Sequence, residues 1–185
     1  MKLNLGCGED IKNGYVNVDF RKTHPSVTQV DLSKFPWPFE TESADEILML
    51  DFLEHFPYRQ TSVLLIECHR ILKNGGDIVI QVPDAGHLAN ALSGQDHLCN
   101  NCGCSVGKDK CQQCGSDLLQ RSKAAMMRLY GGQDYAGNYH FTCFTNQMLE
   151  KIAKDCGFIN PSYEEIDHQF KNWNFKVRFK KGDLW

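Results

Sequence analysis

Short runs of apolar residues limit the fold of this chain more than any other feature. These runs, in which β-branched residues are frequent, cover residues 2–5, 15–20, 27–30, 47–50 and 78–82. Such runs are typical of strands buried on both faces of a parallel sheet. Between the last two runs, apolar residues share one helical face over residues 63–72, and Asn74, Gly75 and Gly76 are expected to end that helix. The pattern predicts an α/β fold with at least one β-α-β unit.

The C-terminal part of the sequence predicts one more helix and one more strand. Apolar residues share one helical face between Thr145, which is suited to cap a helix start, and Gly157, which is suited to end a helix. Residues 174–181 then alternate apolar and basic side chains, which is the period of a half-buried strand. We expect the basic side chains of this strand to face solvent and to protect a sheet edge.

Length and composition fit one globular domain with a small insertion. The chain has 185 residues, of which 42% are hydrophobic and 23% charged, so it can form an ordinary core. The net charge of -3 gives no general attraction to nucleic acid or to anionic lipid. The sequence shows no secretory signal pattern and no apolar run of the length a membrane helix needs. We therefore expect a cytoplasmic protein without membrane contact.

Two glycines one residue apart follow the first predicted strand. Gly6 and Gly8 allow a tight turn and a close approach of a ligand to the backbone, as in nucleotide-binding folds. Taken alone, this turn fits a simple strand ending equally well. Asp19, at the end of the next strand, strengthens the binding interpretation, because such folds place an acid there to accept hydrogen bonds from ribose hydroxyls.

At this point the sequence resembles the class I S-adenosylmethionine-dependent methyltransferases. The matching segments come in the order and spacing of that family: LNLGCGE (3–9), VNVDF (16–20), VDLSKFPWPFETESADEIL (30–48), LDFLEHF (50–56), RILKNGGDIVIQVPD (70–84) and HFTCFTNQMLEKIAKDCGF (140–158). The resemblance implies a Rossmann-like, mostly parallel sheet with an antiparallel C-terminal strand. It also implies a set of cofactor-binding residues near the ends of the first four strands: Gly6, Cys7, Gly8, Asp19, Phe20, Asp31, Leu32, Asp51 and Phe52.

The resemblance assigns these residues to parts of the cofactor. It implies that the glycine turn lines the methionine moiety through backbone atoms, that Asp19 holds the ribose, and that Asp31 and Leu32 meet the adenine. Asp51 and Phe52 are expected to form the floor near the sulfonium. Taken alone, Asp31 also fits a turn or helix-capping residue.

The sequence departs from the family in its first connections. Only residues 6–14 separate the first two strands, which is shorter than a helical crossover between parallel strands usually is. We therefore expect the early helices to be short or missing. Part of one sheet face would then be bare, which favours a homodimer that covers it.

Two C-x2-C-G motifs predict a zinc site. Cys99, Cys102, Cys111 and Cys114 have the spacing of a four-cysteine zinc ribbon, and a site filled by four protein ligands is structural. Free thiols or a redox pair are the alternative, and His97 or Cys104 is a possible substitute ligand. The predicted domains are a core of residues 1–92 and 124–185 and an insertion of residues 93–123. The insertion would serve as a lid or substrate-recognition element, or else as a dimer contact or loop stabiliser.

Several residues are candidates for the chemistry. His140, before the last helix, is suited to be a general base for a hydroxyl acceptor, or else to tie its loop down as a structural residue. Asp51, Glu54 and His55 resemble a divalent-cation cluster of some quinone-biosynthesis O-methyltransferases, although Glu54 and His55 also fit a short helix. Cys7 fits a packing residue better than a nucleophile.

Two functions follow as hypotheses. The first is an S-adenosylmethionine-dependent enzyme that methylates a small or glycan-like acceptor, most simply at oxygen. The second is a non-catalytic methyltransferase-like module whose zinc ribbon engages a protein or nucleic acid. The sequence lacks the Asp/Asn-Pro-Pro-aromatic and Pro-Cys motifs of nucleic-acid base methylation, which disfavours that substrate class.

Overall fold

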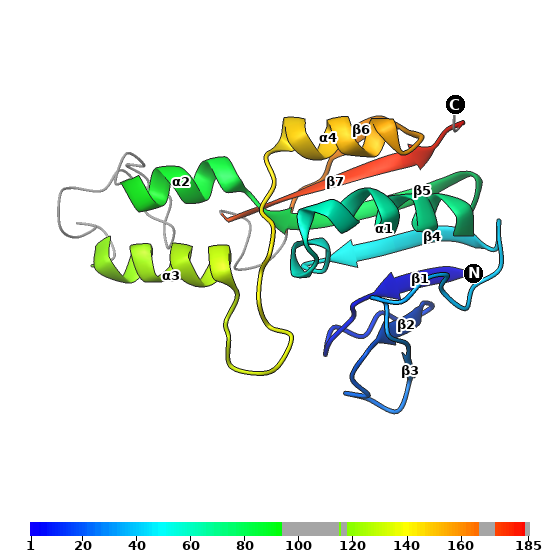
Figure 1. Ribbon diagram of the computed structural model, residues 1–185, viewed down its shortest axis with the longest axis horizontal. Helices are drawn as coiled ribbons and strands as arrows, with labels where there is room; N and C mark the ends of the chain where they lie inside the picture. Colours follow the sequence, from blue (N-terminus) through cyan, green and yellow to red (C-terminus); the bar gives the residue numbers. More distant parts are fainter. Residues whose placement is uncertain (94–114, 116–117, 167–172, 184–185) are drawn as a thin grey trace.

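A seven-stranded sheet forms the centre of the molecule. The computed structural model describes residues 1–93, 115, 118–166 and 173–183, with the side chains of 118–122 left out, and every structural statement below concerns those parts. The strand order is β3-β2-β1-β4-β5-β7-β6 (Figure 1). The strands are β1 (Lys2–Leu5), β2 (Val16–Asp19), β3 (Val27–Gln29), β4 (Ala44–Leu50), β5 (Leu72–Pro83), β6 (Phe158–Tyr163) and β7 (Asn174–Lys181). The helices are η1 (Leu53–His55), α1 (Tyr58–Ile71), α2 (Ala85–Ser93), α3 (Leu118–Tyr130) and α4 (Asn146–Asp155).

The sheet is parallel from β3 to β5 and antiparallel at β7. β1 pairs with both β2 and β4 in parallel, and β4 pairs with β5 in the same sense. β7 runs antiparallel to β5 and to β6. The parallel sheet and the antiparallel C-terminal strand predicted from the sequence are therefore confirmed.

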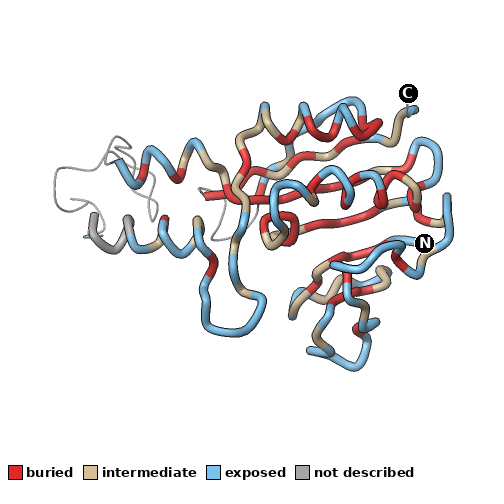
Figure 2. The backbone as a smooth tube through the Cα atoms, in the orientation of Figure 1, coloured by how far each residue is buried: buried red, intermediate tan, exposed pale blue. Residues whose placement is uncertain are grey.

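Helices α1 and α4 cover one face of this sheet (Figure 1). Leu64 and Leu65 of α1 and Leu149 of α4 are fully buried in the main core, together with the strand side chains Ile47 and Ile80. Burying one such side chain contributes roughly 1.5–3 kcal/mol. Buried backbone is concentrated along β4, β5 and the inner sides of these helices (Figure 2).

The first connections hold no helix. Residues 6–43 are all described, and the chain runs through turns and short loops between β1, β2, β3 and β4. The expectation of short or missing early helices is thus confirmed, and the connections from β1 to β2 and from β2 to β3 are too short for a helical crossover.

Charged side chains occupy the sheet face that α1 and α4 leave open. Arg178 of β7 donates hydrogen bonds to Glu46 on β4 (2.8 Å), to Asp77 on β5 (3.3 Å) and to Glu164 (2.6 Å). The strand register explains why these side chains lie close together. Glu46 pairs with Asp77, and Arg178 pairs with Val79, which is two residues further along β5. The face is therefore held by an ion-pair network between neighbouring strands.

β7 does not protect a sheet edge, contrary to the expectation from its basic residues. β6 lies outside it, and the basic side chains of β7 pair with carboxylates. The sequence analysis missed β6 because Pro161 interrupts it and only Phe158 is buried in it. Proline is tolerated in an edge strand, where one side of the backbone faces solvent.

The end of α1 also differs from the sequence expectation. The helix ends at Ile71, and Leu72 is extended and pairs with Ala44 of β4. The sheet pairing therefore takes over the backbone before Asn74 and Gly75 are reached. Gly75, with φ +73°, lies inside the long strand β5 instead of ending the helix.

Helices α2 and α3 project beyond the carboxyl ends of the strands (Figure 1). Leu88 and Ala91 of α2 pack with Ala125 of α3 and with Trp173 in a small separate core. The predicted core boundary at residue 124 falls inside α3. The predicted zinc ligands Cys99, Cys102, Cys111 and Cys114, like the alternative ligands His97 and Cys104, lie outside the described residues.

None of the helices in the described segments combines the length and the hydropathy that spanning a bilayer requires.

We expect Arg178→Ala to lower the free energy of unfolding by roughly 1–2 kcal/mol, because hydrogen bonds to three partly buried carboxylates are lost. Burial alone would raise the pKa of Glu46 and of Glu164, but hydrogen bonds, including those from Arg178, outweigh it and lower both. A lowered carboxyl pKa stabilises the fold above the ordinary value of 4.5, and this stabilisation is lost as pH falls below it. The difference in the free energy of unfolding between wild type and Arg178→Ala should therefore become smaller at acid pH.

Urea unfolding at pH 7 and at acid pH measures this difference. Lys154→Ala, at an exposed position of α4, is the control and should change stability by less than about 0.5 kcal/mol. Equal losses in the two variants would show that the network contributes nothing.

Candidate functional site

A cavity of about 870 Å³ opens at the carboxyl ends of β1, β2 and β4. This is the side on which open α/β sheets bind ligands, and the volume lies in the range of small-molecule and cofactor sites. All nine predicted cofactor-binding residues line it: Gly6, Cys7, Gly8, Asp19, Phe20, Asp31, Leu32, Asp51 and Phe52. The fold thus brings together residues from four separate stretches of sequence.

The glycine turn after β1 depends on the absence of a side chain at Gly6. Gly6 has φ +66°, and a Cβ there would lie 2.0 Å from Cδ2 of Phe52. The Phe52 ring therefore packs directly on the turn. Gly8 also has positive φ, and Cys7 N donates to Val18 O at 3.0 Å, which fixes the turn to β2. Burial, with Asp19 nearby, raises the pKa of Cys7 to about 11, so its sulfur is a thiol.

Asp19 joins the glycine turn to the end of β2. Its carboxylate accepts hydrogen bonds from Gly8 N (2.9 Å) and from Arg21 N (2.8 Å), and the residue is only 5% exposed. A carboxylate has lone pairs for further donors. It can therefore order the turn and still accept a bond from a ligand hydroxyl in the cavity.

Asp31 lies in the cavity wall and also orders its own turn. Its carboxylate accepts from Ser33 N and Oγ and pairs with Lys34 at 3.0 Å. The hydrogen bonds from Ser33, followed by that from Lys34, lower its pKa to about 2. Asp31 is therefore a turn residue that also lines the cavity, and its contact with the adenine stays a prediction.

Asp51 follows β4 in an uncommon backbone conformation. Its φ is +53°, which costs on the order of 1 kcal/mol or more for a residue other than glycine. Its carboxylate accepts hydrogen bonds from Gln81 (3.0 Å) and from Asn174. Residues of β5 and β7 thus hold the Asp51 carboxylate at the carboxyl end of β4, and no pattern in the sequence indicated these two partners.

Glu54 and His55 of η1 meet His140 from the loop that follows α3. Phe141 N donates to Glu54 O at 2.9 Å, which holds that loop against η1. The rings of His55 and His140 are 4.8 Å apart and nearly perpendicular. Burial raises the pKa of Glu54 well above its ordinary value, and the neighbouring Asp51 raises it further.

His140 lies behind His55 as seen from the cavity. His55 lines the cavity, whereas His140 is not among the lining residues. Burial, then the neighbouring His55, lowers the pKa of His140 to about 4, so its imidazole is neutral at pH 7. The role of His140 as general base stays a prediction. Its imidazole would act with a pKa below the ordinary value of 6.5.

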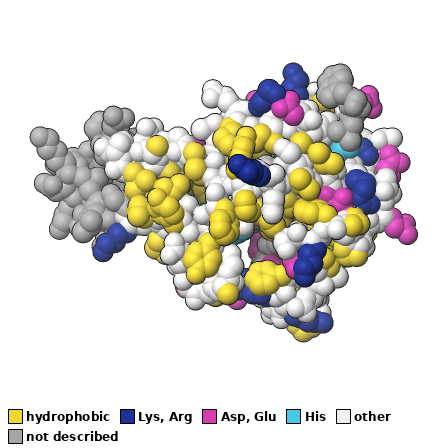
Figure 3. Space-filling model, in the orientation of Figure 1, with side chains coloured by type: hydrophobic (Ala, Val, Ile, Leu, Met, Phe, Trp, Pro, Cys, Tyr) yellow, Lys and Arg dark blue, Asp and Glu magenta, His cyan; other side chains and the backbone are white. Residues whose placement is uncertain are grey.

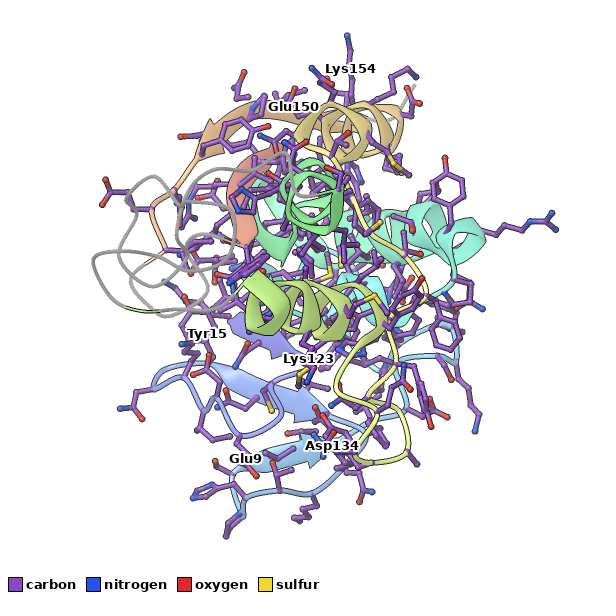
Figure 4. All side chains as sticks on the ribbon, turned by 90° about the vertical axis from the view of Figure 1, so that its left-hand side faces the viewer. Glu9, Tyr15, Lys123, Asp134, Glu150 and Lys154 are labelled. Carbon is purple, nitrogen blue, oxygen red and sulfur yellow. The ribbon has the colours of Figure 1, made fainter. Side chains whose placement is uncertain are left out.

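The loop after α3 adds cavity residues that the sequence analysis missed. Tyr135 and Gly137 line the cavity, and the Arg21 guanidinium stacks over the Tyr135 ring at 4.1 Å. Figure 4 marks this loop with Asp134 and the loop after β1 with Glu9, both below α3 in that view. No pattern in the sequence links positions so far apart, although Arg21 follows the predicted Asp19 by only two residues.

Apolar side chains gather on the surface over α3 (Figure 3). Met126, Met127 and Tyr130 of α3 are about half exposed, as are Tyr139 and Phe141 in the next loop. This surface continues toward the cavity through Tyr135.

We expect Gly6→Ala to destabilise the fold by about 2–4 kcal/mol, because a Cβ would displace the Phe52 ring as well as strain the backbone. Gly14→Ala is the matched control, since Gly14 has φ +81° but nothing within 4 Å of its Cβ position. It should cost only the strain, about 1 kcal/mol. Chemical unfolding of both variants measures the difference, and equal costs would contradict the Phe52 contact.

Comparison with known proteins identifies the fold. Residues 17–80 match the family described as a methyltransferase domain, and no curated protein matches the sequence. A SAM-dependent methyltransferase from Archaeoglobus fulgidus is similar in structure, with 15% identity, 97% of this chain and 85% of that chain covered, and a TM-score of 0.59.

Two further solved structures have the same fold. A SAM-dependent methyltransferase from Methanosarcina mazei has 18% identity, 100% and 92% coverage of the two chains, and a TM-score of 0.58. The 1,6-didemethyltoxoflavin-N1-methyltransferase of Burkholderia thailandensis, solved with S-adenosylhomocysteine, has 14% identity, 98% and 71% coverage, and a TM-score of 0.55. The family match over residues 17–80 and the similar solved structures together show that this chain has the fold of S-adenosylmethionine-dependent methyltransferases.

Proposed function

We propose that this protein is a methyltransferase that binds S-adenosylmethionine in the cavity at the carboxyl ends of β1, β2 and β4 and methylates an oxygen of a small or glycan-like acceptor. The observation that carries the proposal is the gathering of all nine predicted cofactor residues in one cavity of about 870 Å³. These residues come from four separate stretches of sequence.

The cofactor would be held mainly by backbone and carboxylate groups. The turn at Gly6 to Gly8 offers close backbone approach to the methionine moiety, and Asp19 offers acceptor lone pairs to the ribose. Leu32, buried beside Asp31, offers an apolar surface to the adenine. Asp51 and Phe52 would lie next to the sulfonium.

Methyl transfer is an in-line displacement: the acceptor oxygen forms a bond to the methyl carbon, the carbon–sulfur bond breaks, and the acceptor proton leaves to a base or to water. Much of the rate can come from holding oxygen and methyl in line. The chain's own contribution is then positioning, together with exclusion of water by Phe52 and by the Tyr135 loop.

The remaining cavity wall supports a small acceptor with polar groups. Phe56 and Ile166 are apolar, whereas His55, Glu165 and Lys176 can form hydrogen bonds. The net charge of -3 argues against a phosphate-backbone partner. The alternative of a non-catalytic binding module predicts cofactor binding without turnover.

We expect Asp19→Ala to weaken S-adenosylmethionine binding by about 1.5–3 kcal/mol, since charge-assisted hydrogen bonds are lost. Calorimetric titration measures the affinity, with Asp155→Ala on the outer side of α4 as the control. A folded wild type that binds neither S-adenosylmethionine nor its demethylated product would overturn the proposal.

Turnover separates the enzyme from the binding module. Sugars, phenols and small acids are offered with S-adenosylmethionine, and formation of S-adenosylhomocysteine is followed. Turnover with a hydroxyl acceptor supports the proposed reaction, and turnover only with amines or thiols contradicts transfer to oxygen.

The four-cysteine zinc site remains a prediction of the sequence. We expect Cys102→Ser and Cys111→Ser each to lower the zinc content of the purified protein by one equivalent, because a tetrahedral site needs all four thiolates. Elemental analysis measures the change, and an unchanged zinc content would exclude the site.

A further inference from the structure

Glu54 presents a buried carboxylate that has no hydrogen-bond partner in the described chain, although the charge of the Arg128 guanidinium acts on it. The residue is 0% exposed, and neither Oε1 nor Oε2 has a hydrogen-bond partner. A buried polar group without a hydrogen-bond partner is rare in native proteins and needs an explanation. A metal ion or a water molecule that binds there is one such explanation. If residue 54 only filled space, an apolar or amide side chain would do so at a lower desolvation cost than a carboxylate.

Two imidazoles lie beside this carboxylate. One ligand atom from each of Glu54, His55 and His140 lies within 4.8 Å of the others. Two histidines and one carboxylate are a common ligand set for divalent transition metals. Ligand atoms around a tetrahedral zinc lie about 3.4 Å apart for bonds near 2.1 Å, so the separations in the cluster would shorten by at most about 1.4 Å.

Both histidines are oriented by backbone carbonyls. His55 Nδ1 lies 3.0 Å from Tyr139 O, and His140 Nδ1 lies 2.6 Å from Arg128 O. A carbonyl oxygen only accepts, so each Nδ1 carries the proton and each Nε2 keeps its lone pair. Metal-binding histidines usually have such an outer hydrogen bond, which fixes the tautomer and the ring.

The backbone around the three residues is also fixed. Phe141 N and Thr142 N both donate to Glu54 O, and Thr142 Oγ1 donates to Phe56 O at 2.8 Å. His140 N donates to Tyr130 O at 3.1 Å. The loop that carries His140 is therefore joined to η1 on one side and to α3 on the other.

The structure groups a different set from the one that the sequence resemblance suggested. Asp51 is not part of this group, and its carboxylate accepts hydrogen bonds from Gln81 of β5 and from Asn174 of β7. His140 comes from a loop 85 positions after His55 and takes the third place in the cluster.

We propose that Glu54, His55 and His140 bind one divalent transition-metal ion, through the Glu54 carboxylate and Nε2 of both histidines. Three protein ligands leave at least one coordination position open. Because His55 lines the cavity, that position would be accessible to an acceptor oxygen, a role that rests on the proposed function. Metal binding itself does not rest on it.

Manganese(II) is the probe, because it favours oxygen and nitrogen ligands and competes poorly for a four-thiolate site. The full-length purified protein is titrated with Mn²⁺, and the free ion is followed by electron paramagnetic resonance. We expect about one bound ion per chain. Glu54→Gln and His140→Gln should each weaken binding by about 10-fold or more, because each removes one ligand.

Glu40→Gln is the control, since Glu40 is an exposed carboxylate away from the cluster, and it should bind like wild type. Thermal unfolding with and without Mn²⁺ reports whether each variant is folded, and only wild type and the control should be stabilised by the ion. Wild-type binding no tighter than that of Glu54→Gln would overturn the proposal. S-adenosylmethionine binding measured without Mn²⁺ tests the proposed function separately.

Discussion

Strands β1 and β4 pair in parallel at the centre of the sheet, and the chain continues from them to opposite sides, to β2 and β3 on one side and to β5 on the other. The loops after β1 and β4 therefore separate, and a crevice opens where the strand order reverses. Gly6 and Phe52 meet at this crevice, and the close packing of the ring on the glycine allows both loops to approach one another. The cavity, the position of Asp19 and the start of η1 all follow from this pairing.

The missing early helices have a consequence on the other side of the sheet. Instead of packed helices, the open face carries alternating charges whose strand register brings Arg178 to three carboxylates. The expected homodimer rested on an apolar face in need of cover. These ion pairs occupy the face at β4, β5 and β7, and the homodimer stays a prediction.

The cavity and the Glu54 cluster share one structural cause. η1 begins at Leu53, two residues after Asp51, and hydrogen bonds to Glu54 O hold the loop after α3 in place. The same loop carries Tyr135 to the cavity rim and His140 to His55. A cofactor in the cavity and a metal ion in the cluster would therefore be neighbours, and the Tyr135 loop would be sensitive to both.

The sequence alone determined the parallel sheet, α1 and α4, because these depend on local patterns of apolar residues. Through its Gly-x-Gly turn, the acid after the second strand and its family resemblance, it also named nine residues that line one cavity. It did not determine β6, whose Pro161 and exposed residues resemble a loop, or the burial of β7 inside the sheet. The early end of α1 was decided by pairing of Leu72 with Ala44. Tertiary structure likewise decided that Gln81 and Asn174 hold Asp51 and that His140 joins Glu54 and His55. Such contacts join residues from distant parts of the chain, and only the packing of strands and loops specifies which of them meet.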